Sequence, residues 1–403
     1  MTRQKIILAS AHQYDPGIRL GTSYLAEGLA KRGWEALYLD QPTSPFHLAS
    51  PAKRDTALRK LRRAVAARRG GHSVYEFDGG GSVKTLSVVS MLPHVNLGPF
   101  RSGVTLQNWW RASFPSVTAE ITRLGFGSAP ILFDSPVFFP LARAIGARSI
   151  YRYADRMSGF GEITGAMLDL QERVFEEADL VIHSARSLRD DIGGRSGPTL
   201  YLPNGVDLNA FAGETEEPTE LAGLGGPRIV YSGAFGAWFD APLVLAAARA
   251  LPHAQFVLLG QVPRGGFALE GQANVHLLGE RPFAGVARIL RHCHAAIIPF
   301  DVKRMPSVVE AINPLKLYEY GAAGLPVVAY PSAEIRQAGG ATTIYETAAD
   351  FPILLAREIE TDTEEKRRAR RAWARGASWD VRAADLERAI QALPPRLSRS
   401  GPA

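Results

Sequence analysis

The sequence is poor in cysteine and in long apolar runs. Its 403 residues include one cysteine, Cys293, which cannot form an internal disulfide, so a reducing compartment is favoured. A lone cysteine also argues against a cysteine-ligated metal site. No apolar run approaches the roughly 18 residues that a membrane-spanning helix needs. These absences predict a protein without a transmembrane helix or a cysteine-bound metal.

Motifs of nucleic-acid-binding modules are also lacking. The sequence contains no zinc-finger spacing and no aromatic motif of the kind that RNA-binding sheets carry. The net charge of +6 therefore does not by itself indicate a nucleic acid, and none is expected as a partner. A non-catalytic module that binds nucleic acid or a membrane through residues 53–69 stays an alternative.

The excess positive charge lies in the first half of the chain. Residues 1–205 hold 25 Lys and Arg against 18 Asp and Glu, whereas the remainder holds 21 against 22. Eight basic residues gather in one segment, namely Lys53, Arg54, Arg59, Lys60, Arg62, Arg63, Arg68 and Arg69. With Leu58, Leu61 and Val65 at helical spacing, this segment predicts a helix that binds an anionic membrane surface, where each cation adds about 1 kcal/mol. A solvated basic helix is the alternative.

Strand and helix signals alternate along the chain and restart once. In the first half the strand-like segments are 5–10, 34–39, 84–91, 130–133, 149–153, 180–183 and 199–202. The polar stretch 213–227 interrupts the pattern, and strands follow at 228–232, 255–259, 275–278, 295–299 and 327–330. Two α/β halves predict two Rossmann-like, doubly wound domains, at 1–212 and 213–376, followed by a helical end and a disordered tail at 394–403. Ligands are expected at the carboxyl ends of the strands, in a cleft between the halves.

The stretch from Glu310 to Gly324, EAINPLKLYEYGAAG, carries the clearest binding signal. Pro314 precedes a short helix with Lys316 and Glu319 on one face, and Gly324 ends that helix before an apolar strand. A phosphate is expected against the helix N-terminus and Lys316, while Glu319 accepts hydrogen bonds from ribose hydroxyls. The alternative is an ion pair on a surface helix.

Further polar or glycine-rich positions follow predicted strands. Gly233 and Gly236 come directly after the first strand of the second half, where backbone amides can approach a phosphate; a structural turn is the alternative. In the first half, His12, Asp134 and Asp155 follow strands. Asp155 or His12 is placed to take a proton from a bound hydroxyl. An Asp paired with a neighbouring Arg, and a capping or packing His, are the alternatives.

An aromatic segment, 96–114, separates two of the first-half strands. Trp109 and Trp110 lie in it between Arg101 and Arg111. Because its pattern is unlike that of a sheet strand, we expect a surface or acceptor-facing segment, with both tryptophans near the acceptor or the membrane.

The order of these motifs resembles that of the GT-B glycosyltransferases, from residue 5 to about 393. The segments that carry the resemblance are SAH, IYRYADRMSGF, LYLPNGVD, IVYSGAFGAWFD, VHLLGERPF, IIPF, NPLKLYEYGAAGLPVVA and SWD. It is closest to the group around glycosyltransferase family 4 and extends to the glucuronosyltransferases that assemble xanthan-type exopolysaccharide.

The resemblance implies an α/β fold of the GT-B type, in which two Rossmann-like domains face a central cleft and the last helix, about 377–393, packs back on the first domain. It implies metal-independent transfer, without a cofactor, from a nucleotide-diphosphate sugar to a hydroxyl of a lipid-linked saccharide or glycan. A UDP-sugar is favoured, with UDP-glucuronate among the candidates. The expected location is cytoplasmic, peripheral on the inner face of a bacterial cell membrane. A sugar-nucleotide 2-epimerase of the same fold is the other reading.

The resemblance also assigns roles to residues. Glu319 matches the acidic residue that holds the donor ribose, and Asp155 matches a proposed general base. The diphosphate residues are matched by Gly233, Gly236, Pro314, Leu315 and Lys316. The cations usual after the glycine turn are replaced by Ala237, Trp238 and Phe239, so Arg304 or Lys303 is expected to supply charge. Glu310 and Glu319 lie nine residues apart, a departure that leaves inversion or retention of the anomeric configuration open.

Overall fold

The computed structural model describes residues 3–15, 20–51, 54–92, 98–159, 163–263, 267–340 and 342–394. The chain forms two compact units, Met1–Leu202 with Arg382–Ala403 and Pro203–Val381. The division falls before residue 203, whereas the sequence pattern placed it after residue 212. The reason is that segment 203–212 packs into the second unit, where the Asn204 N–H donates to Asn313 Oδ1 at 2.9 Å and Val206 lies in a buried cluster with Tyr318. Lys53 and the predicted tail from residue 395 onward lie outside the described residues.

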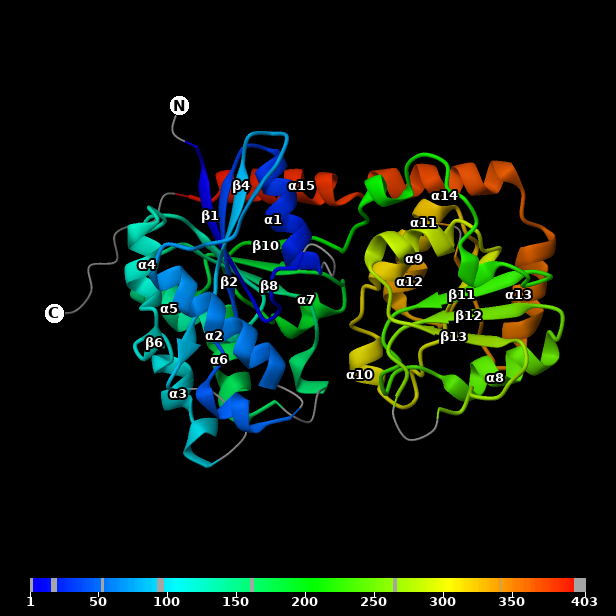
Figure 1. Ribbon diagram of the computed structural model, residues 1–403, viewed down its shortest axis with the longest axis horizontal. Coiled ribbons are helices and arrows are strands. Elements are labelled where there is room, and N and C mark those ends of the chain that lie inside the picture. The colour runs from blue at the N-terminus through cyan, green and yellow to red at the C-terminus, as the bar shows by residue number, and fades with distance from the viewer. Residues whose placement is uncertain are drawn as a thin grey trace. The chain divides into compact units, whose positions relative to one another are not determined.

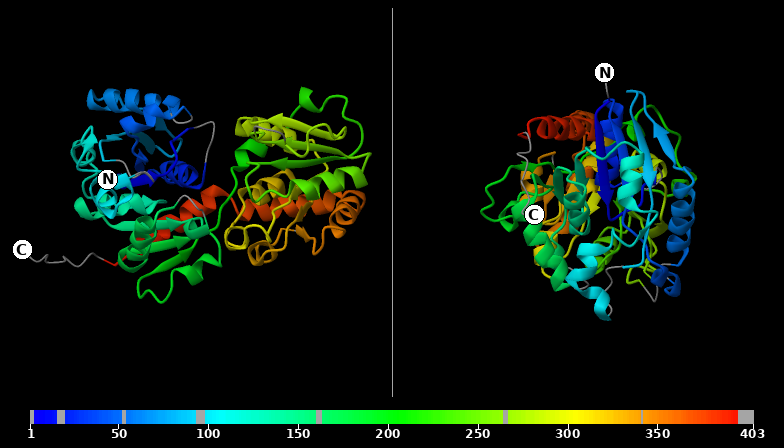
Figure 2. Two further views of the ribbon diagram at one scale, coloured as in Figure 1. Left: turned by 90° about the horizontal axis from the view of Figure 1, so that it is seen from below. Right: turned by 90° about the vertical axis from the view of Figure 1, so that its left-hand side faces the viewer.

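The first unit is built on a sheet with the order β10-β9-β8-β7-β1-β2-β4-β3, parallel except where β3 meets β4. Helices lie on both sides of this sheet (Figure 1 and Figure 2). Its strands are β1 (Lys5–Ser10), β2 (Glu35–Asp40), β3 (Val74–Glu76), β4 (Ser82–Leu86), β7 (Ile131–Phe133), β8 (Ser149–Tyr153), β9 (Leu180–His183) and β10 (Thr199–Tyr201). Its helices are α1 (Gly21–Lys31), α2 (Arg54–Arg68), α3 (Gly103–Asn108), α4 (Val117–Arg123), α5 (Phe139–Ala144), α6 (Gly165–Glu177) and α7 (Leu188–Asp191), with most of α15 (Trp379–Gln391).

The central strands are mainly apolar because both of their faces are covered. Ile6, Ile7 and Leu8 of β1 have no exposed surface, as expected for a parallel strand between helical layers. The chain first winds from β1 toward β2 and then returns to the other side of β1 at β7. The carboxyl ends of β1 and β7 therefore form a topological switch point, the usual place for a ligand in such sheets.

Segment 84–91 is not one strand. It divides into the end of β4 and a short β5 (Val89–Ser90), which pairs antiparallel with β6 (Ser113–Phe114) away from the main sheet. The aromatic segment between β5 and β6 contains α3, and Trp109 at its end is buried rather than at the surface, with 1% exposure. Its indole N–H donates to the Val137 carbonyl at 2.7 Å. The prediction that Trp109 faces a membrane or acceptor is therefore wrong.

Helix α2 lies on the outside of the first unit (Figure 2). It turns a face rich in alanine inward. Its buried residues are Ala57, Lys60, Ala64 and Ala67. The Lys60 side chain, 8% exposed, donates from Nζ to the Gln41 carbonyl at 2.8 Å. Lys60 is thus wrongly predicted as a membrane-facing residue, because the small alanines rather than the leucines set the buried face.

The second unit is built on a parallel sheet with the order β13-β12-β11-β14-β15-β16. Its strands are β11 (Arg228–Ser232), β12 (Gln255–Leu259), β13 (Val275–Gly279), β14 (Ala295–Ile298), β15 (Val327–Ala329) and β16 (Thr342–Ile344), the last of which the sequence pattern omits. Its helices are α8 (Ala241–Ala250), α9 (Phe283–Leu290), α10 (Pro306–Val309), α11 (Leu315–Ala323), α12 (Ala333–Ala338), α13 (Asp350–Glu360) and α14 (Glu364–Gly376). The same winding recurs, so the switch point lies between β11 and β14.

The last helix, α15, returns to the first unit, to which residues from Arg382 onward belong. The Trp34 indole N–H donates to Glu387 Oε1 at 2.8 Å, and Arg148 Nη1 donates to the Leu393 carbonyl at 3.3 Å. Among the described residues, no helix combines the length and apolarity needed to cross a bilayer.

Candidate functional site

Helix α11 begins beside the switch point of the second unit. Pro314 occupies its N-cap position in an extended conformation, and Gly324 ends it with a φ of 82°, a conformation that suits glycine. Leu315 is its first residue, and Lys316 and Glu319 are both partly buried. The predicted helix with its proline start and glycine stop is therefore present.

The Lys316 ammonium lies against the turn that follows β11. Its Nζ is 5.3 Å from the ring centroid of Tyr231 and 4.9 Å from that of Phe300. Tyr231 belongs to β11 and Phe300 follows β14, so the cation sits at the switch point itself. Contact with two aromatic faces stabilises a cation that burial would otherwise disfavour.

Gly233 makes room for this ammonium. A Cβ built on Gly233 would lie 3.2 Å from both Lys316 Cε and Nζ, and its φ of 141° is one that other residues rarely adopt. Its N–H donates to the Leu259 carbonyl at 2.9 Å. The structure thus brings the glycine turn and Lys316 together, as the sequence predicts.

Gly236 has a different neighbour. A Cβ at this position would lie 2.6 Å from the ring of Trp238, so the indole packs on the glycine backbone. The turn consequently offers an aromatic side chain at the place where the family resemblance implies cations.

Burial moves both charged groups of α11 toward neutrality. It lowers the pKa of Lys316 to about 8, although Glu319 favours the charged ammonium. It raises the pKa of Glu319 to about 7, although Lys316 favours the carboxylate. Both groups thus titrate close to neutral pH, which is typical of functional sites.

The other predicted cation lies on a different segment of the second unit. Arg304 is exposed in the segment between β14 and α10, and its backbone N–H donates to Asp301 Oδ1 at 3.0 Å. Lys303 beside it is also exposed. Lys316 is the cation that the structure sets against the glycine turn, and Arg304 lies on a loop that follows the same sheet edge.

In the first unit, Asp134 holds the switch point together. Its carboxylate accepts hydrogen bonds from Ser10 Oγ at 2.6 Å, from the Ala11 N–H at 2.8 Å and from Thr22 Oγ1 at 2.8 Å. These bonds tie the end of β1 to the start of α1. Asp134 therefore has a structural role, and its lone pairs are engaged.

Asp155, which follows β8, keeps an accessible side chain, and so does His12, which follows β1. The crowded protein around Asp155 raises the pKa of its carboxyl, while Arg152 and His12 lower it and Asp134 raises it. Arg156, the other flanking arginine, pairs with Asp191 instead, at 2.7 Å. The structure thus brings Asp155 and His12 into electrostatic contact at one sheet edge and leaves the carboxylate reachable by a substrate.

The sequence reasoning missed the roles of Tyr231 and Phe300. Both end or follow a strand at the switch point, and each was visible only as part of a resemblance motif. Their position after apolar strands was the available signal, but their contact with Lys316 depends on two strands adjacent in space and distant in sequence.

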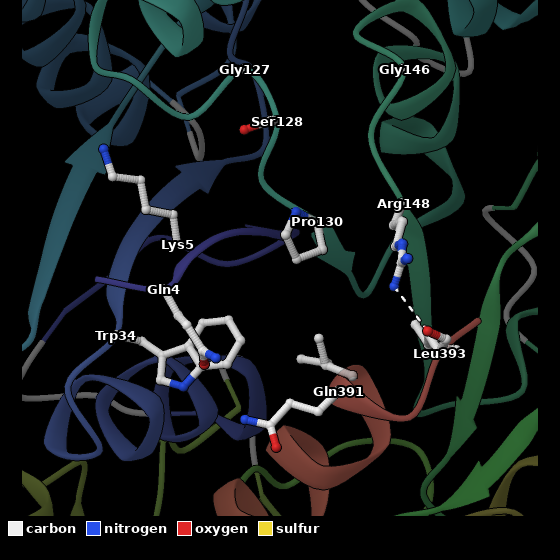
Figure 3. Close-up of a pocket in the computed structure, with 11 residues that line it drawn as sticks. Gln4, Lys5, Trp34, Gly127, Ser128, Pro130, Gly146, Arg148, Gln391 and Leu393 are labelled. Carbon is white, nitrogen blue, oxygen red and sulfur yellow. Dashed lines mark hydrogen bonds between the residues drawn. The ribbon is translucent and has the colours of Figure 1, made fainter. Parts of the chain in front are cut away.

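A cavity of about 890 Å³ lies at the opposite, amino-terminal edge of the first sheet. Figure 3 shows Gln4, Trp34 and Gln391 around it, with Arg148 bonded to Leu393. Its other cation, Lys5, donates to the Gly125 carbonyl at 3.1 Å. The predicted site residues do not line it, and its two cations have protein partners. Among the described residues, no three His, Cys, Asp or Glu side chains gather as a metal site.

Comparisons with known proteins identify the fold. No family model and no curated protein sequence matches the chain. Solved structures do match, with two Rossmann-like α/β domains, and the chain therefore has the GT-B fold that its motifs predict. The resemblance to GT-B glycosyltransferases is confirmed at this level.

Three of these structures cover nearly the whole chain. A sucrose-phosphate synthase from Thermosynechococcus elongatus has a TM-score of 0.69 and 16% identity over 96% of this chain and 98% of that one. A trehalose-6-phosphate synthase, studied for glycosyl transfer with retention, has a TM-score of 0.66 and 10% identity, over 97% of this chain and 100% of that one. Anabaena HepE, in complex with UDP and glucose, has a TM-score of 0.61 and 16% identity, over 97% of this chain and 100% of that one.

Proposed function

We propose that the protein is a glycosyltransferase that uses a UDP-sugar as donor. The observation that carries this proposal is the position of Lys316, which lies at a switch point against a glycine turn and between two aromatic rings. That the structurally similar HepE binds UDP and glucose supports the choice of UDP. UDP-glucuronate and UDP-hexoses are both candidate donors.

The donor would lie with its diphosphate at the start of α11. Unpaired backbone N–H groups and the positive end of the helix dipole favour an anion there, and Lys316 adds a full charge. Glu319 lies one turn further along, within reach of a ribose whose diphosphate contacts the helix start. The departing UDP is stabilised by Lys316 and these amides, so no metal is required in the proposal.

The first unit supplies the acceptor side. In an inverting reaction, the acceptor oxygen bonds to the anomeric carbon, the bond from that carbon to the diphosphate breaks, and Asp155 takes the hydroxyl proton. The raised pKa of Asp155 makes it a stronger base than an ordinary aspartate. His12 is the second candidate base. In a retaining reaction, as studied for the trehalose-6-phosphate synthase, neither group needs to act in this way.

We further propose a lipid-linked saccharide as acceptor and an anionic membrane as the place of work, in exopolysaccharide or glycolipid assembly. Arg59, Arg62 and Arg63 are exposed on the outer face of α2. The short 3₁₀ helix Pro45–Ala49, which packs beside α2, presents Phe46 with 52% exposure against Phe100. Neighbouring cations and an exposed phenylalanine suit a surface of anionic lipid. Trp110, partly exposed under the Arg111 guanidinium, is a further candidate contact.

A donor screen tests the proposal. Nucleotide sugars are compared by the thermal shift they produce, and the product formed with bacterial lipid-linked saccharides is examined by NMR at its anomeric proton. We expect stabilisation by UDP-sugars and a new glycosidic bond. Conversion of the donor without an acceptor would identify an epimerase, whereas no shift with any nucleotide sugar would contradict the proposal and favour a binding module.

A further inference from the structure

The chain crosses between the two units at residues 202–203 and again at 381–382, and both crossings are attached to α11. Val206 donates from its N–H to the Ala377 carbonyl at 3.1 Å and accepts at its own carbonyl from the Trp379 N–H at 3.1 Å. A Cβ on Gly205 would lie 2.8 Å from Ala377 O, so glycine allows the two crossings to run this close. Val206 also packs with Tyr318 and Ala322 of α11 in one buried cluster.

Helix α11 therefore makes contacts on two different faces. Tyr318 and Ala322, four residues apart, share the face that holds the crossings. Lys316 lies two residues from Tyr318, which turns it about 200° around the helix axis, toward the glycine turn. One short helix thus contacts both the proposed donor and the segments that join the units.

A pair of asparagines fixes the first crossing to the start of α11. The Asn204 N–H donates to Asn313 Oδ1 at 2.9 Å, and Asn204 Nδ2 donates to the Asn313 carbonyl at 2.6 Å. Asn313 immediately precedes Pro314, the N-cap of α11. We call these two residues the asparagine clasp.

Asn313 of the clasp also bonds to two buried side chains. Asn313 Nδ2 donates to Tyr318 Oη at 3.0 Å and to Glu334 Oε1 at 2.8 Å. Asn313 is 3% exposed and Glu334 1%. Buried polar networks whose members are bonded to one another are rigid, so a change at the start of α11 is transmitted to residue 204 rather than absorbed locally.

We propose that the asparagine clasp couples the donor site to the first crossing, with Asn204 and Asn313 as positioning residues. This inference rests on the proposed donor site. A diphosphate that orders the start of α11 also orders Asn313 and, through it, residues 203–206. The ligand class at this site is a nucleoside diphosphate, and the effect at the crossing follows its binding.

Amide hydrogen exchange with UDP as the probe tests the coupling on the full chain. In the unaltered protein UDP slows exchange at 315–319 and also at 204–206. In Asn204→Asp, a carboxylate oxygen faces the Asn313 carbonyl where the amide donated, so the slowing at 204–206 is lost while that at 315–319 remains. In Asn204→Ala the slowing at 204–206 is weaker. Asn209→Ala, an exposed position nearby, serves as the matched control and behaves like the unaltered protein.

The same variants separate coupling from simple destabilisation. We expect the UDP dissociation constant to change less than about threefold, whereas sugar transfer slows about tenfold, in the usual range of coupling between sites. If UDP slows exchange at 204–206 in Asn204→Asp as much as in the unaltered protein, the proposed coupling through the asparagine clasp is contradicted. If Asn204→Asp loses the UDP-dependent slowing at 315–319 as well, and its melting temperature falls, the clasp is a structural contact and does not couple the two places. Absence of UDP binding by the unaltered protein would instead remove the proposed function on which the clasp rests.

Discussion

The two units share one strand order around their first strand but use charge at the switch point in opposite ways. In the second unit, the partly buried Lys316 lies near two aromatic rings and against a glycine. In the first unit, the carboxylate of Asp134 accepts three hydrogen bonds, and Asp155, which follows the neighbouring strand, stays accessible. The difference teaches that a cation lies at one switch point and an accessible carboxylate at the other, which matches the donor and base roles that we propose for the two units.

The largest effect is expected at Asp155, which we propose as a base and not as a binding group. Asp155→Asn should slow sugar transfer about 100-fold to 10,000-fold, the range for loss of a general base. The dissociation constant for UDP, measured by calorimetry, should stay the same, as should both quantities in the exposed control Asp169→Asn. If Asp155→Asn transfers sugar at the normal rate, Asp155 is not the general base. A retaining reaction, or His12 as the base, is then favoured.

Membrane attachment should belong to the first unit alone. Replacing Arg59, Arg62 and Arg63 by Gln removes about 3 kcal/mol of attraction to anionic lipid, which is over about 100-fold in vesicle binding. A matched triple in the second unit, Arg249, Arg288 and Arg375, is also exposed and should leave binding to phosphatidylserine vesicles unchanged in sedimentation. Equal losses in the two triples would mean that net charge, not this surface, is responsible.

Donor affinity should depend on the second unit. Glu319→Gln replaces the carboxylate that accepts from ribose hydroxyls, and we expect UDP to bind about 10-fold to 100-fold more weakly, as for a hydrogen bond to a charged group. Glu365→Gln, at an exposed position of α14, is the control. If calorimetry gives the same affinity for both variants, Glu319 does not hold the ribose.

The smallest effect is a pH dependence confined to the donor site. Because burial lowers the pKa of Lys316 to about 8, its ammonium is charged below that pH and neutral above it. UDP affinity should therefore fall by up to about tenfold per pH unit above 8. Lys316→Arg keeps its charge throughout and should flatten the profile. If UDP affinity falls by the same factor with pH in Lys316→Arg, the pH dependence belongs to another titrating group.

Much of the fold could be predicted from sequence because buried parallel strands are short apolar runs with clear ends. The bounds of β8, β9, β11 and β12 agree with the strand-like segments. Edge strands such as β3 and β16 were missed, since an edge strand needs less apolar character. Segment 84–91 was read as one strand because its break depends on pairing with distant β6.

The candidate site was predictable where its parts lie close in sequence. Pro314, Lys316 and Glu319 fall within one helical turn or two, and the glycine turn follows its strand directly. The burial of Lys60 was not predictable in this way, because leucine outranks alanine in hydropathy and the Gln41 carbonyl that receives Lys60 lies on another element. The burial of Trp109 was not predictable for the same reason, since its hydrogen-bond acceptor, the Val137 carbonyl, is 28 residues away.

The central claim is that the start of α11 and the turn after β11 hold a nucleoside diphosphate. Titration of the full chain with UDP in a calorimeter, followed by amide hydrogen exchange of the complex, tests it most directly. The account predicts saturable binding with slowed exchange at 233–236 and 315–319. No binding, or slowed exchange confined to the cavity residues near 4–5 and 146–148, would contradict it.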